Sequence, residues 1–319
     1  RSRNRIAINY DPKAECPRFL NRLLAPAMTG DDIDCLQLYF GQCLLGVNHS
    51  QMFLMLTGTA GGGKSTLVNI IEGIIGRQNC TELRLEHMVN RFEMNRLIGK
   101  TLLTAKDVPS YFMNNKGAQK LKALTGKDTL TTEAKGSNEA VDIVGEFNVI
   151  ITSNSDLQIN VDADNEAWRR RMLWIRYECP PVAERIDAFD ELLLREEGAG
   201  ILNWGIEGAR RLLKNKGLIQ RSANHSLRVD ELLQESDSVA AFIDTCVVRA
   251  TGESVTSEAL YTAYLNFCRA QDWEPKEERR ARRGFRSVIN AKFQIPYRHD
   301  ISSGNGYVRR GYVGIKIRS

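Results

Sequence analysis

Short, continuous apolar runs recur along the first half of the chain. Residues 52–57 read Met-Phe-Leu-Met-Leu-Thr and are followed by a glycine, which predicts a strand buried on both faces. Similar runs predict strands at residues 101–105, 147–152 and 172–177. After the first run, apolar residues at helical spacing predict a helix over residues 64–75. Strands that alternate with helices indicate a parallel α/β sheet.

Helical periodicity flanks these runs, and a different pattern closes the chain. Residues 10–45 read as helical, and helical spacing returns after Pro181. From about Ser236 the pattern predicts three further helices, over residues 239–248, 258–270 and 279–291. Two strand-like segments follow, split by residues 302–306 with their Asn-Gly turn signal. Three helices followed by a hairpin predict a winged-helix-like module.

Charge is unevenly distributed along the chain. There are 44 Lys plus Arg against 39 Asp plus Glu, a net charge of +5. Residues 269–319 hold 13 of the basic residues and 5 of the acidic ones, so we expect a polyanion to bind there. No apolar run reaches the ~18–20 residues of a membrane-spanning helix, which excludes a membrane protein.

The seven cysteines are scattered and never spaced as CxxC, and the four histidines are dispersed. This pattern argues against a disulfide framework and against a metal site built from protein ligands alone, and it indicates a reducing compartment. The basic N-terminus lacks the apolar stretch of a signal peptide. Because no Met begins the chain, we expect a piece of a longer protein.

The strongest motif stands between the first apolar run and the helix after it. Residues 58–65 match GxxxxGK[ST] in full: Gly58, Thr59, Ala60, Gly61, Gly62, Gly63, Lys64 and Ser65. In such a P-loop the glycines let backbone N–H groups wrap phosphates, and the helix N-terminus favours their negative charge. We expect Lys64 to reach the β- and γ-phosphates, Ser65 to ligate Mg²⁺, and Thr66 to complete the binding segment. The motif predicts binding of a nucleoside triphosphate.

Polar residues accompany three other predicted strands. Asp107 ends an apolar strand as in a Walker B motif, where it would hold Mg²⁺ through water or polarise the attacking water. Lys106 stands where a partner acid is usual. Asn154 follows the third run, at the position that senses the γ-phosphate in a P-loop ATPase. Residues 169–171 are three arginines before the last strand, of which at most two can face one neighbour.

In this order, the motifs resemble those of superfamily 3 helicases, the AAA+-related ring motors of viruses, phages and plasmids. The likeness is strongest to the helicase part of the poxvirus- and phage-type primase-helicases. Four further stretches carry it: residues 91–102, 121–128, 200–204 and 236–242. It extends over about residues 10–317. Lys106-Asp107 and Ser155-Asp156 depart from the family pattern.

The resemblance implies roles for several residues. Asp107 would supply Walker B function, Asn154 would be sensor 1, and an arginine would complete a neighbouring subunit's site. We favour Arg171 for this role, with Arg170 second. Residues 129–143 would form a hairpin that lines a central pore. Its DNA contacts would come from the base and the tip: Lys127, Lys135 and Asn138.

In the basic tail, four arginines fall at i, i+3, i+4 and i+7 and form one helical stripe: Arg279, Arg282, Arg283 and Arg286. Apolar residues point toward a core: Phe285, Val288 and Ile289. A basic stripe opposite an apolar one suits a helix that lies along a phosphate backbone. The alternatives are a solvated charged face and a contact with an acidic neighbour.

These observations predict an α/β protein with a P-loop AAA+-like core, a parallel sheet, flanking helices and a C-terminal winged-helix-like domain. We expect four parts: an N-terminal helical segment (1–45), a P-loop NTPase/helicase core (46–180), a helical subdomain (181–235) and a winged-helix-like DNA-binding domain (236–319). The predicted function is an ATP- and Mg²⁺-dependent helicase of viral, phage or plasmid replication, in the cytoplasm of a host cell. It would form a homo-oligomeric ring, a hexamer by resemblance, and act on single-stranded and forked DNA. If the parent protein also primes, its primase domain lies upstream of Arg1.

Two other functions share these motifs. A DNA-binding ATPase initiator or switch would have every nucleotide motif but would not unwind DNA. A small-molecule P-loop kinase would share the P-loop, but the basic tail and the lack of an evident acceptor pocket argue against it.

Overall fold

The computed structural model describes residues 6, 8–88, 90, 92–113, 116–133, 140–157, 165–180, 186–235, 237–271, 273, 275–302 and 308–318. The chain divides into two compact units. The first comprises residues 1–157 and 166–230, and the second comprises residues 158–165 and 231–319.

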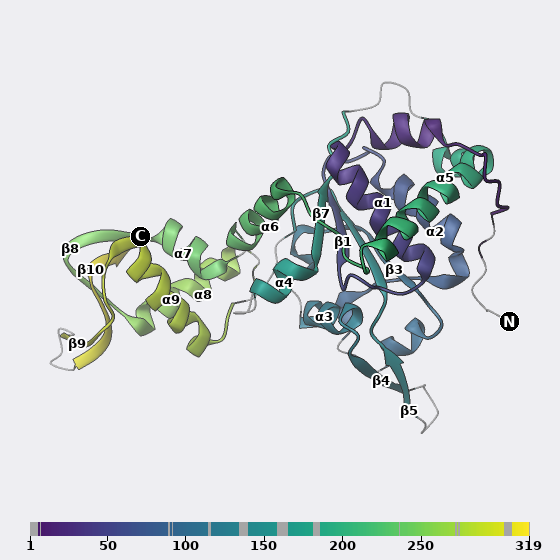
Figure 1. Ribbon diagram of the computed structural model, residues 1–319. Helices are drawn as coiled ribbons and strands as arrows, with labels where there is room; N and C mark the ends of the chain where they lie inside the picture. The colour runs from purple at the N-terminus through teal and green to yellow at the C-terminus, as the bar shows by residue number, and fades with distance from the viewer. Residues whose placement is uncertain are drawn as a thin grey trace. The chain divides into compact units, whose positions relative to one another are not determined.

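A five-stranded parallel sheet forms the centre of the first unit (Figure 1). Its strands are β1 (Phe53–Thr57), β2 (Cys80–Glu82), β3 (Leu102–Val108), β6 (Asn148–Ser153) and β7 (Met172–Arg176). The strand order is β2-β3-β6-β1-β7, so β1 lies between β6 and β7. Every residue of β1 and β6 is buried, as their continuous apolar runs predict. The predicted parallel α/β sheet is confirmed, and the short strand β2 is an addition to it.

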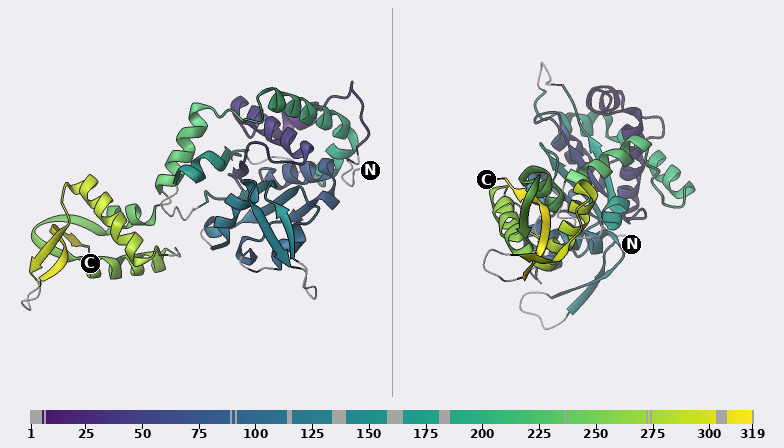
Figure 2. Two further views of the ribbon diagram at one scale, coloured as in Figure 1. Left: turned by 60° about the horizontal axis from the view of Figure 1, so that its bottom comes forward. Right: turned by 90° about the vertical axis from the view of Figure 1, so that its left-hand side faces the viewer.

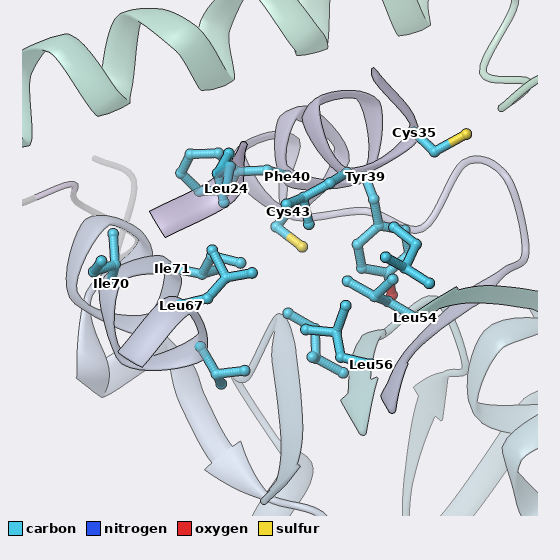
Figure 3. Packing of buried hydrophobic residues seen from close by; sticks show 14 of the residues in the cluster. Leu24, Cys35, Tyr39, Phe40, Cys43, Leu54, Leu56, Leu67, Ile70 and Ile71 are labelled. Atoms are coloured by element: carbon cyan, nitrogen blue, oxygen red, sulfur yellow. The ribbon is translucent and has the colours of Figure 1, made fainter. Parts of the chain in front are cut away.

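Helices cover the sheet. Three of them contribute to its main buried cluster: α1 (Gly30–Leu45), α2 (Lys64–Ile75) and α5 (Phe189–Lys214). Leu54 and Leu56 of β1 share one buried cluster with Phe40 of α1 and with Leu67 and Ile71 of α2 (Figure 3). This cluster is the main core of the first unit, and it fixes α2 against the strand that precedes the glycine-rich turn.

Three further helices are α3 (Lys120–Thr125), α4 (Asn165–Arg171) and α6 (Ala223–Glu235). The rings of Phe53 on β1 and Trp168 on α4 meet edge to face, with their centroids 6.1 Å apart. The backbone N–H of Trp174, on the edge strand β7, donates to Nε2 of His225 across 2.7 Å. A side chain of α6 thus satisfies a backbone donor at the edge of the sheet.

Short helical turns complete the first unit: η1 (Phe19–Leu24), η2 (Arg77–Asn79), η3 (Leu85–His87), η4 (Glu93–Leu97), η5 (Ser110–Phe112) and η6 (Lys116–Gln119). The segment predicted as helical over residues 10–45 contains two separate helices, the π-helical turn η1 and α1. Pro26 lies between them and cannot donate a backbone hydrogen bond, which interrupts the helical ladder. Thr29 then caps α1, because its hydroxyl accepts from the backbone N–H of Asp32 across 3.3 Å.

The hairpin predicted within residues 129–143 has arms β4 (Thr129–Glu133) and β5 (Ala140–Val144), which pair antiparallel (Figure 2). Its predicted tip, with Lys135 and Asn138, lies outside the described residues.

The second unit contains three helices and a three-stranded antiparallel sheet of order β8-β10-β9 among its described residues. Its elements are α7 (Ser238–Cys246), β8 (Val247–Thr256), α8 (Ser257–Ala270), α9 (Glu278–Phe293), β9 (Arg298–Ser302) and β10 (Val308–Ile317). Aromatic rings from all three helices form its core: Phe242, Tyr264 and Phe285.

One prediction for this unit is wrong. The helix expected over residues 239–248 ends at Cys246, and β8 begins at Val247. β8 pairs with β10, so that Val247 lies opposite Ile317, far along the chain. The β-branched residues at this point fit a sheet, but the pairing that stabilises the strand is non-local and leaves no signal in the local pattern.

Candidate functional site

The glycine-rich turn, residues 58–63, joins the carboxyl end of β1 to the first residue of α2. Three of its glycines have positive φ angles: Gly58 (144°), Gly61 (74°) and Gly63 (102°). A Cβ atom added at Gly58 would lie 2.1 Å from the carbonyl oxygen of Tyr177, so only glycine fits there. Gly63 is the N-cap residue of α2 and has no side chain with which to cap the helix. The turn is therefore a backbone cradle at an uncapped helix N-terminus, which suits an anion.

Lys64 is the first residue of α2, and its side chain folds back over the turn. Its Nζ donates to the carbonyl oxygens of Gly58 and Thr59, each across 2.8 Å, and to Oδ1 of Asn154 across 3.0 Å. These three acceptors match the three donors of an ammonium group. Lys64 is 3% exposed, and burial lowers its pKa, while the carboxylate of Asp107 acts in the opposite direction.

Asn154 joins Lys64 to Asp107. Its amide Nδ2 donates to Oδ1 of Asp107 across 3.0 Å, while its Oδ1 accepts from Lys64. β6 lies between β1 and β3, so the residue after β6 reaches both neighbours at the carboxyl edge of the sheet. The three residues predicted from separate motifs therefore form one hydrogen-bonded chain.

A bulge in β3 aims Asp107 at this chain. The β3–β6 register shifts between Ala105 and Val108, and Asp107 has a φ of 53°. The backbone N–H of Asp107 donates to Oγ1 of Thr152 across 3.0 Å, and Oγ of Ser153 donates to the Val108 carbonyl across 2.8 Å. Two hydroxyls of β6 thus stabilise a backbone conformation that is unfavourable for an aspartate.

Lys106, which stands in place of the usual partner acid, contacts α2 instead of the turn. Its Nζ donates to Oε2 of Glu72 across 2.8 Å and to Oδ1 of Asn69 across 2.7 Å. The other oxygen of Glu72 accepts from Oγ1 of Thr104 across 2.7 Å. Lys106 therefore ties β3 to the helix that follows the glycine-rich turn.

The arginine triplet lies in α4, immediately before β7. Arg169 pairs with Asp230 across 2.5 Å and with Glu166. Arg171 is 8% exposed and donates to the carbonyl of Ala167, whereas Arg170 is exposed. Arg171, favoured from the sequence for a contact with a neighbouring subunit, faces the interior of its own chain.

Asp156 and Arg176 lie near the turn, and the sequence motifs assigned neither of them a role. Asp156, two residues after Asn154, accepts from Oγ1 of Thr57 across 3.0 Å and from Arg176 across 3.2 Å. Thr57 and Arg176 end their strands side by side. The signals that could have found them are an acid just beyond the sensor position and a charged residue at the end of a buried strand.

The predicted DNA-binding residues belong to other elements of the chain. Lys127 is exposed at the base of the β4–β5 hairpin. The arginines of α9 belong to the second unit, where Phe285 and Ile289 are fully buried and Val288 packs against the same core. Arg282 is half-buried and pairs with Glu278, one turn earlier on the same helix. The other three arginines of the stripe are exposed: Arg279, Arg283 and Arg286.

Within the described ranges, no group of three or more His, Cys, Asp or Glu residues could hold a metal ion. The seven cysteines are free thiols. Of the helices in the part of the chain that the structure describes, none combines the length and apolar character that a membrane crossing requires.

Two family profiles match parts of the chain. Residues 56–171 match one described as a family of unknown function (DUF5906), which spans the glycine-rich turn, Asp107, Asn154 and the arginine triplet. Residues 234–308 match one described as poxvirus D5 protein-like, which spans most of the second unit. No curated protein matches the chain.

The chain is also similar to solved structures of the NrS-1 C terminal region. One, the A form apo structure, has 15% identity and a TM-score of 0.50 over 96% of this chain and 77% of that chain. A second apo structure, of residues 305–718, has 16% identity and a TM-score of 0.48 over the same shares. At this identity the first likeness shows the fold alone. The α/β architecture with a mostly parallel sheet and flanking helices is shared with that protein.

Proposed function

We propose that the chain is an ATP-driven, ring-forming DNA helicase of superfamily 3, from a viral, phage or plasmid replication system. The observation that carries the proposal is the hydrogen-bonded chain from Lys64 through Asn154 to Asp107, beside an anion cradle at a helix N-terminus. P-loop NTPases use this set of groups, a lysine on phosphate, an acid near the metal and a polar group that orients water.

The residues present fit ATP and Mg²⁺. The backbone of residues 58–66 would hold the phosphates, where a Cβ at Gly58 would clash with the chain itself. Lys64 would exchange its acceptors on the turn for the β- and γ-phosphates, and Ser65 and Asp107 would hold Mg²⁺. The metal would neutralise charge on the phosphates. Lys106 stands where a second acid is usual, and it pairs with Glu72. Asp107 is therefore the residue of β3 that would act on the metal.

Hydrolysis in this proposal depends on a neighbouring subunit. Arg170 is the better candidate for the arginine that reaches the neighbour's γ-phosphate, because it is exposed and Arg171 is buried. An arginine that acts across an interface makes each site incomplete until a ring forms, which couples hydrolysis to assembly.

Single-stranded DNA would contact the pore hairpin through Lys127, Lys135 and Asn138. The second unit has the element order of a winged helix, with α9 as the helix that lies on DNA and β9–β10 as the wing. Its exposed arginines, Arg279, Arg283 and Arg286, would bind phosphates. The match to the poxvirus D5 protein-like profile supports a role in viral replication.

The decisive experiment measures ATP hydrolysis and strand separation on a forked duplex, together with the mass of the protein with and without nucleotide. We expect hydrolysis that single-stranded DNA stimulates, ATP-dependent unwinding, and a mass several times that of the chain. Hydrolysis and DNA binding without unwinding would replace the helicase with an ATPase initiator or switch. An absence of nucleotide binding would overturn the proposal.

A further inference from the structure

Asp156 connects the segment that carries Asn154 to two strands at once. One carboxylate oxygen accepts from Oγ1 of Thr57 on β1, and the other accepts from Arg176 on β7, across 3.0 and 3.2 Å. Thr57 is itself fixed, since it is 1% exposed and its Oγ1 accepts from Nε1 of Trp174 across 2.8 Å. The segment after β6 is therefore bound by one side chain to the end of β1 and to the end of β7.

This tie does not depend on the contacts that Asn154 makes. The partners of Asn154 are Lys64 and Asp107, and under the proposed function both would turn to ATP and Mg²⁺ when these bind. Asn154 is exposed, so its surroundings alone do not hold it. Leu157 is fully buried and anchors the far end of the segment. Two polar contacts of the segment would remain in place during turnover: the hydrogen bond from the backbone N–H of Ser155 to Oγ of Ser153 across 3.3 Å, and the longer-range side-chain tie made by Asp156.

The ion pair contributes little to folding. The side chains of Asp156 and Arg176 are 46% and 42% exposed, and exposed ion pairs stabilise proteins weakly. A carboxylate nevertheless suits this position, because both of its oxygens accept, whereas an amide would offer one acceptor and place a donor opposite the other partner. The Asp156 carboxylate is therefore suited to orienting the segment that carries Asn154, and not to stabilising the fold.

We propose that Asp156 is a positioning residue for ATP hydrolysis, which holds Asn154 in register with the γ-phosphate, and that Arg176 orients the Asp156 carboxylate. The inference rests on the proposed function. Asp156 acts through Asn154 and touches no reacting atom.

The experiment is a double-mutant cycle in the full chain. Asp156→Asn should lower kcat for ATP hydrolysis by roughly 10-fold or more, because small misplacements of a catalytic group are costly, while KM for ATP and the Tm stay near the wild-type values. Asn154→Ala should lower kcat further. In the Asn154→Ala background, Asp156→Asn should have no additional effect, because the residue it positions is gone. Arg176→Ala should show a weaker form of the same kcat loss, and Arg176→Lys should recover part of it.

Asp34→Asn is the control, since Asp34 on α1 forms another exposed acid–arginine pair, with Arg211 across 3.0 Å. It should leave kcat unchanged. Additive losses in the cycle, a fall in Tm that accounts for the lost activity, or an unchanged kcat would overturn the inference while leaving wild-type ATPase intact. A wild-type protein that binds no ATP would instead refute the proposed function, and the inference with it.

Discussion

Nδ2 of Asn154 lies 3.0 Å from Oδ1 of Asp107, although 47 residues separate them in the chain. The hydrogen bond requires β3 and β6 to be neighbours and β3 to bulge at Asp107. With Lys64 on the other side of Asn154, an amide stands between a cation and an acid. A phosphate that drew Lys64 away would free Oδ1 of Asn154, and a metal ion that drew Asp107 away would free Nδ2. A residue that senses the γ-phosphate needs such a free end.

Lys64→Ala should abolish ATP hydrolysis without unfolding the chain, because the variant lacks the ammonium that offsets phosphate repulsion. ATPase rate and Tm are the measurements. Lys100→Ala is the control, since Lys100 is half-buried and donates to the carbonyl of Gln78 across 2.7 Å, away from the turn. Near-normal turnover in a folded Lys64→Ala variant would refute the nucleotide site.

Arg170→Ala should lower ATP hydrolysis by ~10³-fold while ATP binding persists, because the arginine acts on a neighbour's nucleotide. Mixing this variant with Lys64→Ala should restore part of the activity, since some interfaces then combine two intact halves. Arg171→Ala should instead lower the Tm, because its side chain is buried. If Arg171→Ala is the variant that folds normally, loses hydrolysis and is rescued by mixing, the assignment between the two arginines is reversed.

Replacement of Arg279, Arg283 and Arg286 by Ala should weaken DNA binding and reduce its salt dependence. The log–log slope on duplex DNA should fall by ~0.9 for each phosphate that α9 no longer neutralises. Binding titrations at several salt concentrations test this. Arg282→Ala is the matched control on the same helix, because Arg282 is half-buried and pairs with Glu278. An unchanged slope in the triple variant would indicate that α9 contacts a neighbouring subunit and does not bind DNA.

His225 should make the stability of the chain pH-dependent. Its Nε2 must be unprotonated to accept from the N–H of Trp174, and burial, reinforced by Arg221 and Arg228 and opposed by Asp32, lowers its pKa from 6.5 to about 4. The unfolded chain therefore binds a proton at a higher pH than the folded chain does. The stabilisation is complete above about pH 6.5 and is lost as the pH falls toward 4, by about 3 kcal/mol. Urea unfolding between these pH values should show this slope, and His225→Gln should flatten it; equal slopes would exclude His225 as the source.

Gly41→Ala should destabilise the first unit by about 3 kcal/mol or more, because the new Cβ would lie 2.1 Å from the backbone nitrogen of Ala209 where α1 and α5 cross. Gly30→Ala, on the same helix, is the control, since nothing described lies within 4 Å of its added Cβ. Urea unfolding of both variants tests the difference. A Gly41→Ala variant as stable as Gly30→Ala would mean that the two helices separate at little cost.

Local pattern was sufficient for the elements whose signal is local. The apolar runs before Gly58 and Asn154 form buried strands, and α2 begins at Lys64 as the motif predicts. Both features can be predicted because a continuous apolar run and a glycine-rich turn are patterns of adjacent residues. Pattern failed at β8, which depends on pairing with a strand near the chain's end. It also could not show that Arg282 pairs with Glu278, since hydrophobic periodicity does not reveal which basic residue finds an acidic partner.

The site depends on relationships that no short window of residues contains. The amino-acid sequence identifies Lys64, Asp107 and Asn154 as separate candidates, and the order β2-β3-β6-β1-β7 joins them. A shift of one residue in register turns a strand's side chains to the other face, so the bulge at Asp107 could be known only from the paired strands. The burial of Arg171 likewise comes from packing between distant segments. Strand order, register and packing depend on contacts between residues that are far apart in the sequence. In this protein these contacts decide which candidate side chains meet.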